Sequence, residues 1–189
     1  MRACCEDTKT KRKRWSGRHE RMLKKAVMER YNASTKESRS AWCHLLDQCV
    51  ESEARVVNLV PDSFQSTELS YLFGVGEMPR MDPRNELTLH HRVAEAWDRG
   101  DIAIVPVPSE TPNEVNQWKF VVVNKNIRKE VVYCWPTTWN DVDGRILQFR
   151  GKNRPGKRYL YFGYFMTYFH QKRLGNMKSA YNIELRGHL

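Results

Sequence analysis

The chain has 189 residues, of which 40% are hydrophobic and 29% are charged. This length suits one domain with a hydrophobic core and is short for two. The longest apolar run, residues 159–169, is interrupted by Gly163 and Thr167. A transmembrane helix needs about 20 apolar residues, so we expect none. No apolar stretch follows the basic N-terminus, so we expect no secretory signal either.

The cysteines indicate neither a disulfide framework nor a zinc ribbon. There are five of them, an odd number, and no two form a CxxC pair. Without a secretory signal we expect an intracellular, reducing compartment, either the nucleus or the cytoplasm. We expect Cys43, Cys49 and Cys134 to be buried thiols.

The net charge of +10 is unevenly distributed along the chain. Residues 1–30 have 11 basic and 4 acidic side chains, net +7, and residues 145–189 have 10 and 1, net +9. The residues between have 11 basic and 17 acidic side chains, net −6. This distribution suits a protein whose two basic ends bind a polyanion close to a site built of carboxylates. A basic tail and a basic helix face also occur in proteins that bind no polyanion.

The N-terminal quarter is predicted to be a tail followed by helices. Residues 1–14 are polar and charged without periodicity, so we expect a disordered basic tail. Its cluster of Lys11, Arg12, Lys13 and Arg14 fits a nuclear address or a nucleic-acid-binding arm. Apolar residues at helical spacing predict a helix over residues 15–31. A second helix is expected from a cap at Ser34 or Thr35 to about Cys49.

The rest of the chain reads as alternating strands and helices, which predicts the α+β class. Strands are expected at residues 55–60, 86–89, 102–107, 118–124, 130–133 and 145–149. The segment 130–133 is expected to complete a hairpin with the strand before it. Helices are expected at residues 63–73, 91–97 and 158–173, and Gly100 is expected to cap the second of these. The last helix carries seven Phe and Tyr rings, which we expect to be core rather than a base-stacking platform.

Four segments in the middle of the chain occur in a specific order. Residues 55–61 read RVVNLVP, 84–89 read RNELTL, 93–100 read VAEAWDRG and 102–106 read IAIVP. Further on, residues 143–150 read DGRILQFR, Arg154 precedes a proline, and residues 158–162 read RYLYF. This order resembles the HNH nuclease domain found widely in fungal proteins, whose motifs read AHLVP or AHIVP, NGL or NAL, HKAFDRG and IAIVP. The resemblance covers about residues 41–170.

The resemblance implies a central ββα-metal unit, in which two strands and a helix surround one divalent metal, with flanking helices and a small antiparallel sheet. It implies one HNH-like domain over residues 15–189, with its motif core at about 53–107 and the sheet and aromatic helix at 117–175. In the family, a histidine that ends the first strand activates water, an asparagine orients that histidine, and a helix histidine binds the metal. The metal would be magnesium, manganese or zinc.

The motif positions are altered in this chain. The position of the general base holds Asn58, the central asparagine is kept as Asn85, and the helix histidine is replaced by Ala94. An amide is not a base at neutral pH, and alanine binds no metal. We expect both positions to face a polar cleft, so that histidines introduced there would be tolerated. His90 and His91 precede Ala94 by four and three residues, so they are candidate shifted metal ligands or simply polar residues at a strand–helix junction.

These observations together predict an HNH endonuclease-like domain that acts on or binds nucleic acid, DNA more than RNA. Hydrolysis of phosphodiesters is expected to be weak or lost, and the metal weakly bound or absent. The expected phosphate contacts are the cluster at residues 11–14 and Lys157, Arg158, Lys172 and Arg173. The alternative is a catalytically dead scaffold that binds a protein partner. A third interpretation is a purely structural interaction domain with no nucleic-acid role, which the salt dependence of binding would separate from the others.

Overall fold

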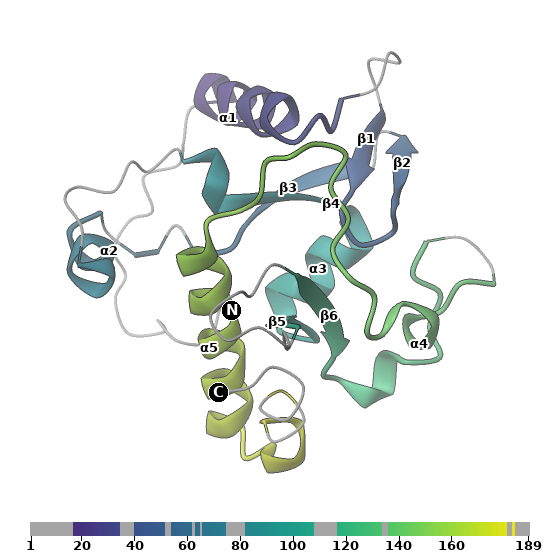
Figure 1. Ribbon diagram of the computed structural model, residues 1–189. Helices are drawn as coiled ribbons and strands as arrows, with labels where there is room; N and C mark the ends of the chain where they lie inside the picture. The colour runs from purple at the N-terminus through teal and green to yellow at the C-terminus, as the bar shows by residue number, and fades with distance from the viewer. Residues whose placement is uncertain are drawn as a thin grey trace.

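Three antiparallel hairpins and a long C-terminal helix form the framework of the protein in the computed structural model (Figure 1). The structure describes residues 17–34, 40–51, 54–61, 63–64, 66–74, 82–107, 117–133, 136–180 and 183. The helices are α1 (Gly17–Arg30), α2 (Ser66–Phe73), η2 (Pro83–Asn85, a 3-10 helix), α3 (His91–Arg99), η3 (Lys125–Ile127, a 3-10 helix), α4 (Trp139–Val142) and α5 (Lys157–Arg173). The strands are β1 (Ser40–Cys43), β2 (Gln48–Glu51), β3 (Ala54–Asn58), β4 (Glu86–His90), β5 (Ile102–Pro106) and β6 (Trp118–Val122).

The predicted α+β class is confirmed, and the elements with clear local boundaries lie close to their predicted places. The strands predicted at residues 55–60, 86–89, 102–107 and 118–124 correspond to β3, β4, β5 and β6. Asp82 caps η2 by accepting a hydrogen bond from the backbone of Arg84 at 2.9 Å. Gly100 ends α3 in the left-handed conformation, with φ of 74°, as expected. The helices predicted over residues 15–31, 63–73 and 158–173 correspond to α1, α2 and α5.

The helix predicted from Ser34 or Thr35 to Cys49 is wrong, because β1 and β2 pair there as a hairpin. Residues 35–39 lie outside the described part of the chain. Asp47, in the turn, has a positive φ of 57°. Tertiary hydrogen bonds hold β1 extended: the Trp42 amide donates to the Ala33 carbonyl, and the Thr88 hydroxyl donates to the Trp42 carbonyl. Such long-range contacts outweigh local helix propensity.

Two further predicted strands are not regular strands. Residues 130–133 do not pair with the strand before them, and Val131 instead forms a single bridge with Thr138 later in the chain. The segment at residues 145–149 follows β6 through a bridge between Ile146 and Lys119. The Leu147 amide also donates to the Trp118 carbonyl at 2.8 Å, so the chain runs beside β6 without forming a full ladder.

The main core lies where α3, α5 and the hairpins meet. β4 and β5 are buried along their whole lengths. α5 approaches this core closely at Gly163, where an added Cβ would lie 3.1 Å from the Trp97 ring and 3.4 Å from the Leu59 carbonyl. Glycine therefore lets α5 pack directly against α3 and the end of β3.

Two smaller clusters extend the core. On one side of the β5–β6 hairpin, Tyr164 of α5 packs with Ala103, Val105, Val121, Val123 and Ile183. At the other end of the molecule, Val27, Tyr31 and Ala33 attach α1 to the rest of the fold.

Cys43 is a buried thiol, as predicted, whereas Cys134 lies outside the described residues. In the described part of the chain, no helix is both long and apolar enough to cross a membrane.

Candidate functional site

β3, β4 and α3 form a strand–strand–helix unit that contains the motif positions. β3 and β4 pair antiparallel, with Asn58 opposite Glu86 and Ala54 opposite His90. α3 begins directly after β4 and turns back over the hairpin. The Trp97 indole nitrogen donates to the Asn58 carbonyl at 3.2 Å, which fixes the end of α3 beside the end of β3.

Asn85 holds the chain where it leaves β3. Its side-chain oxygen accepts from the Val60 amide at 2.9 Å, and its side-chain nitrogen donates to the Val60 carbonyl at 3.2 Å. The Asn85 carbonyl also accepts from the Leu59 amide at 2.8 Å. Three hydrogen bonds thus fix the segment directly after Asn58.

The position expected to hold the helix histidine is part of the core. Ala94 is 1% exposed and packs with Val93, Ala96 and Trp97 on the buried face of α3. The expectation that Ala94 faces a polar cleft is therefore wrong. The methyl side chain fits the close packing of helix and hairpin, which leaves no polar surface at this position. Asn58, by contrast, is half-buried at the end of β3.

His90 and His91 lie at the other end of the hairpin from Asn58. His90 is the last residue of β4 and His91 the first of α3, and the register places His90 four residues from the Asn58–Glu86 pair. At about 3.3 Å per residue, this separates the two places by roughly 13 Å. The His90 ring is 1% exposed and contacts the rings of His91, at 4.4 Å, and Tyr133, at 5.1 Å. The candidate ligands are thus not brought to the candidate base position.

Among the described residues, no group of three His, Cys, Asp or Glu side chains lies close enough together to hold a metal ion.

A cluster of basic side chains lies where the end of α1 meets the segment before α5. Residues 150–158 contain five basic residues and no acidic one. Arg30 joins them across the sequence, because its guanidinium donates to the Arg154 carbonyl at 3.2 Å and its own carbonyl accepts from the Asn153 side chain at 2.7 Å. We call this set the basic cluster: Arg30, Arg150, Lys152, Arg154, Lys157 and Arg158.

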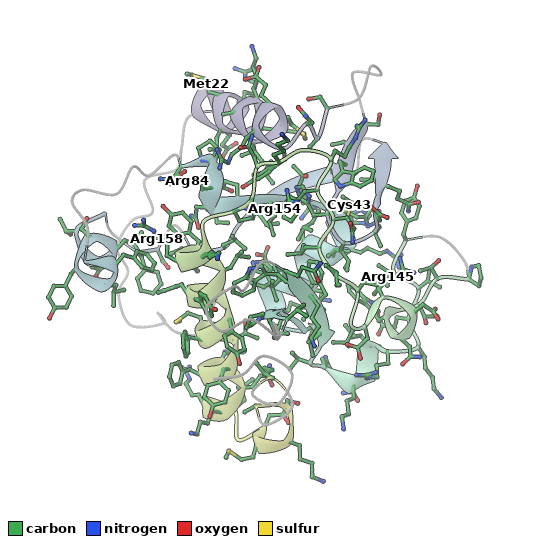
Figure 2. All side chains as sticks on the ribbon, in the orientation of Figure 1. Met22, Cys43, Arg84, Arg145, Arg154 and Arg158 are labelled. Atoms are coloured by element: carbon green, nitrogen blue, oxygen red, sulfur yellow. The ribbon has the colours of Figure 1, made fainter. Side chains whose placement is uncertain are left out.

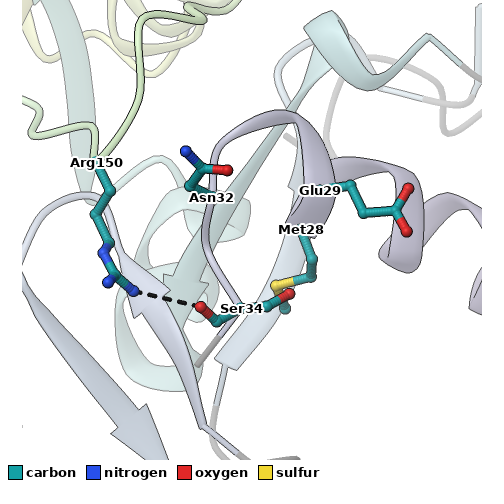
Figure 3. Close-up of a pocket in the computed structure, with 5 residues that line it drawn as sticks. All are labelled: Met28, Glu29, Asn32, Ser34 and Arg150. Atoms are coloured by element: carbon teal, nitrogen blue, oxygen red, sulfur yellow. Dashed lines mark hydrogen bonds between the residues drawn. The ribbon is translucent and has the colours of Figure 1, made fainter. Parts of the chain in front are cut away.

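Three guanidinium groups of the basic cluster, those of Arg30, Arg150 and Arg154, donate to carbonyl oxygens rather than to carboxylates. Arg154 donates to the carbonyls of Gly151, at 2.6 Å, and Asn153, at 2.9 Å, and lies 4.7 Å from the centre of the Phe149 ring. Arg150 donates to the Ser34 carbonyl at 3.3 Å (Figure 3). Neutral carbonyls fix the position of a guanidinium without cancelling its charge, so the cluster keeps its full positive charge.

Other arginines of the fold show the contrast. Arg55, Arg99 and Arg128 form ion pairs with Glu95, Asp101 and Asp143, respectively. None of the six basic-cluster residues has a carboxylate partner within the described part of the chain. Lys157 and Arg158 also stand in the first turn of α5, where the helix dipole disfavours cations. This is an arrangement that an anion would stabilise.

A hydrogen-bonded link joins the basic cluster to the strand–strand–helix unit. The buried carboxylate of Asp82 accepts from the Tyr159 hydroxyl and from the Arg84 guanidinium, each at 2.8 Å. Burial raises the pKa of Asp82, but the bonds from Arg84 and Tyr159 outweigh it and leave this pKa below its ordinary value. The Gly156 amide donates to the Arg84 carbonyl at 3.0 Å. Figure 2 shows Arg84 and Arg158 near the start of α5, Arg154 nearer the middle of the view, and Arg145 apart beside α4.

The remaining predicted phosphate contacts are elsewhere. Lys172 and Arg173 are exposed in the last turn of α5, about 22 Å along the helix from Lys157. The segment with Lys11, Arg12, Lys13 and Arg14 lies outside the described residues. Of the basic cluster, only Lys157 and Arg158 were among the phosphate contacts expected from the sequence. The run of five basic residues in nine positions was a signal for Arg150, Lys152 and Arg154, whereas the contact of Arg30 depends on the fold.

Two hollows border the basic cluster. An open pocket of about 510 Å³ lies between α1 and Arg150 (Figure 3), lined also by Met28, Glu29, Asn32 and Ser34. A smaller groove of about 190 Å³ is lined by Arg154, Lys157, Trp118 and Phe149, among others.

Comparisons of this chain with known protein families, with curated proteins and with solved structures find no match.

Proposed function

We propose that this chain is an HNH-like ββα-metal domain protein that binds nucleic acid through its basic cluster and has weak or lost phosphodiester hydrolysis. The observation that carries binding is the set of positive charges at Arg30, Arg150, Lys152, Arg154, Lys157 and Arg158. Carbonyl oxygens position the guanidinium groups of Arg30, Arg150 and Arg154 without neutralising them. Phosphate groups are the ligands that such a surface fits best.

Three observations support weak or lost hydrolysis. Asn58 cannot accept a proton at neutral pH. Ala94 is buried in the core, so no ligand can replace it without repacking. His90 and His91 lie at the far end of the hairpin from Asn58. Losing a general base alone reduces the rate by on the order of 10²–10⁴. Any divalent metal would therefore need ligands at positions other than those that bind it in the HNH nuclease domains that this chain resembles.

The binding proposal predicts a steep salt dependence. If all six charges contact phosphates of duplex DNA, the logarithm of the association constant falls with the logarithm of salt concentration with a slope of about −5. Because the contacts are to phosphates, duplexes of different sequence should bind with similar affinity. Fluorescence anisotropy with two labelled duplexes, over a series of NaCl concentrations, measures both properties.

A matched pair of variants tests the location. Lys152→Gln, Lys157→Gln and Arg158→Gln together remove three charges from the basic cluster, and each side chain is exposed. The control changes three exposed lysines elsewhere to glutamine, namely Lys125, Lys129 and Lys178. The cluster variant should lower the magnitude of the slope by about 3, and the control by much less. A wild-type protein that binds neither duplex would refute binding.

Hydrolysis is tested on supercoiled plasmid DNA with magnesium, manganese or zinc. We expect no nicking above background with the wild-type protein. Nicking that disappears with a chelator and in the Asn85→Ala variant would contradict the loss of activity and would indicate an alternative ligand set.

A further inference from the structure

The outer face of α5 carries two exposed aromatic rings. Of the seven Phe and Tyr rings of this helix, Tyr159 and Tyr164 are buried in the core. Phe165 and Phe169, by contrast, are 42% and 56% exposed. These two rings are nearly parallel, with centroids 6.4 Å apart and planes at 22°. The expectation that the aromatic run is core therefore holds for part of the helix, and two rings point away from it.

The two rings lie on one stripe with basic residues at both ends. Phe165, Phe169 and Lys172 follow Arg158 by 7, 11 and 14 positions, which places them within about 60° of it around an α-helix. All four side chains are exposed. α5 contains no acidic residue along its 17 positions. The helix lies on the outside of the molecule, beside the β5–β6 hairpin (Figure 1).

Charge complementarity identifies the kind of ligand that fits this stripe. A second copy of the chain is disfavoured, because two such faces would bring like charges together. An anionic ligand is favoured at both ends, and a flat apolar ligand is favoured in the middle. Nucleic acid combines the two properties, since its phosphates are anionic and its bases stack on aromatic side chains.

The strand form follows from the exposed rings. In a duplex the faces of the bases are already stacked on one another, so only unpaired bases can stack on Phe165 and Phe169. The basic ends of the stripe, Arg158 and Lys172, are about 21 Å apart along the helix. This is roughly the length of six nucleotides stacked at 3.4 Å.

We propose that the outer stripe of α5, formed by Arg158, Phe165, Phe169 and Lys172, is a stacking platform for an unpaired nucleic-acid strand. This rests on the proposed function and adds the strand form of the ligand and the residues that select it. The basic cluster holds phosphates of either form, whereas the two phenylalanines distinguish single strands from duplexes.

The test removes the rings but keeps the charge. Phe165→Leu with Phe169→Leu preserves apolar side chains and removes both aromatic faces. The matched control is Tyr71→Leu, which removes a ring that is 89% exposed on α2. The ligands are a 20-nucleotide single strand with a central 2-aminopurine and a duplex of the same length, at one salt concentration. Thermal melting verifies that each variant is folded, which is expected because the altered rings are exposed.

We expect the double variant to bind the single strand at least tenfold more weakly than the wild type, with duplex affinity within twofold. Stacking of the 2-aminopurine should change its fluorescence with the wild type and the control but not with the double variant. Equal affinity of wild type and double variant for the single strand would overturn the platform while leaving the proposed function intact.

Other outcomes are equally informative. An equal loss for single strand and duplex would also overturn the platform, because it would mean that the rings do not select strand form. A wild-type protein that binds neither ligand would overturn the proposed function itself. Self-association of the wild type that the double variant lacks, seen by sedimentation equilibrium, would show that a second copy covers the rings and would refute the platform.

Discussion

His44 is a fully buried imidazole, and we predict that it makes the fold sensitive to mild acid. Its Nδ1 lies 2.8 Å from the Gln148 carbonyl, which can only accept, so Nδ1 carries the hydrogen. Added acid must therefore protonate Nε2. That atom is buried and has no hydrogen-bond partner among the described residues. Around it, the rings of Tyr31 and Phe149 lie 5.2 and 4.5 Å from the imidazole centroid.

The magnitude follows from the pKa of this group. Burial lowers the pKa of His44 from 6.5 to about 4, although the hydrogen bond to Gln148 acts in the opposite direction. Below pH 6.5 the unfolded chain therefore binds a proton that the folded chain does not. The stability is fully present above pH 6.5 and is lost as the pH falls towards 4. The complete loss is ~3 kcal/mol, of which about 2 kcal/mol falls between pH 7 and pH 5.

Urea denaturation at pH 7, 6 and 5 measures this loss. His44→Phe keeps a ring in the aromatic cluster but removes the titrating group. His44→Asn removes it too while retaining an N–H donor for the Gln148 carbonyl. Both variants should be less stable than the wild type at pH 7 and should lose much less stability on acidification. If all three proteins lose stability with the same pH dependence, the buried neutral imidazole is not the cause.

Three further predictions follow from the site. Ala94→His should lower the free energy of unfolding by ~2 kcal/mol or more, because it overpacks the core, and a urea midpoint equal to that of the wild type would contradict this. Asn85→Ala should cost ~1–3 kcal/mol by the same assay, since it leaves the Val60 amide without its side-chain acceptor. Deleting residues 1–14, which hold six basic side chains, should weaken binding to all DNA sequences alike and reduce the magnitude of the salt slope by up to about 5. An unchanged slope would exclude phosphate contacts by the tail.

Local signals in the sequence were sufficient for much of the fold. β-branched runs bounded by proline or glycine located β3 and β5. Gly100 located the end of α3, because only a residue that tolerates positive φ ends a helix in this way. The β1–β2 hairpin was not predictable in the same manner. Its extended form depends on the bond that the Ala33 carbonyl accepts from the Trp42 amide and on the bond that the Thr88 hydroxyl donates to the Trp42 carbonyl, and both partners lie outside the hairpin.

Little of the candidate site's geometry could be predicted from the sequence. The motif order singled out Asn85, whose bonds to both backbone groups of Val60 are seen only in the fold. The surroundings of Ala94 depend on how closely α3 approaches the hairpin, which spacing along the chain does not reveal. Likewise, the exposure of Phe165 and Phe169 depends on which face of α5 packs inward, and the hydrophobic pattern of this aromatic-rich helix is too uniform to indicate it.

Because α5 packs closely against α3 at Gly163, we expect that the motif core, residues 53–107, does not fold as an independent unit. A two-stranded hairpin is at best marginally stable alone. An excised fragment of residues 53–107 would expose the Trp97 ring to water where α5 now covers it. It would also lose the hydrogen bond that the Asp82 carboxylate accepts from the Tyr159 hydroxyl. Producing residues 53–107 alone, or transferring them to another protein, would thus require α5 as well. Insertions into the chain should be tolerated better away from the contact between α5 and α3 than within it.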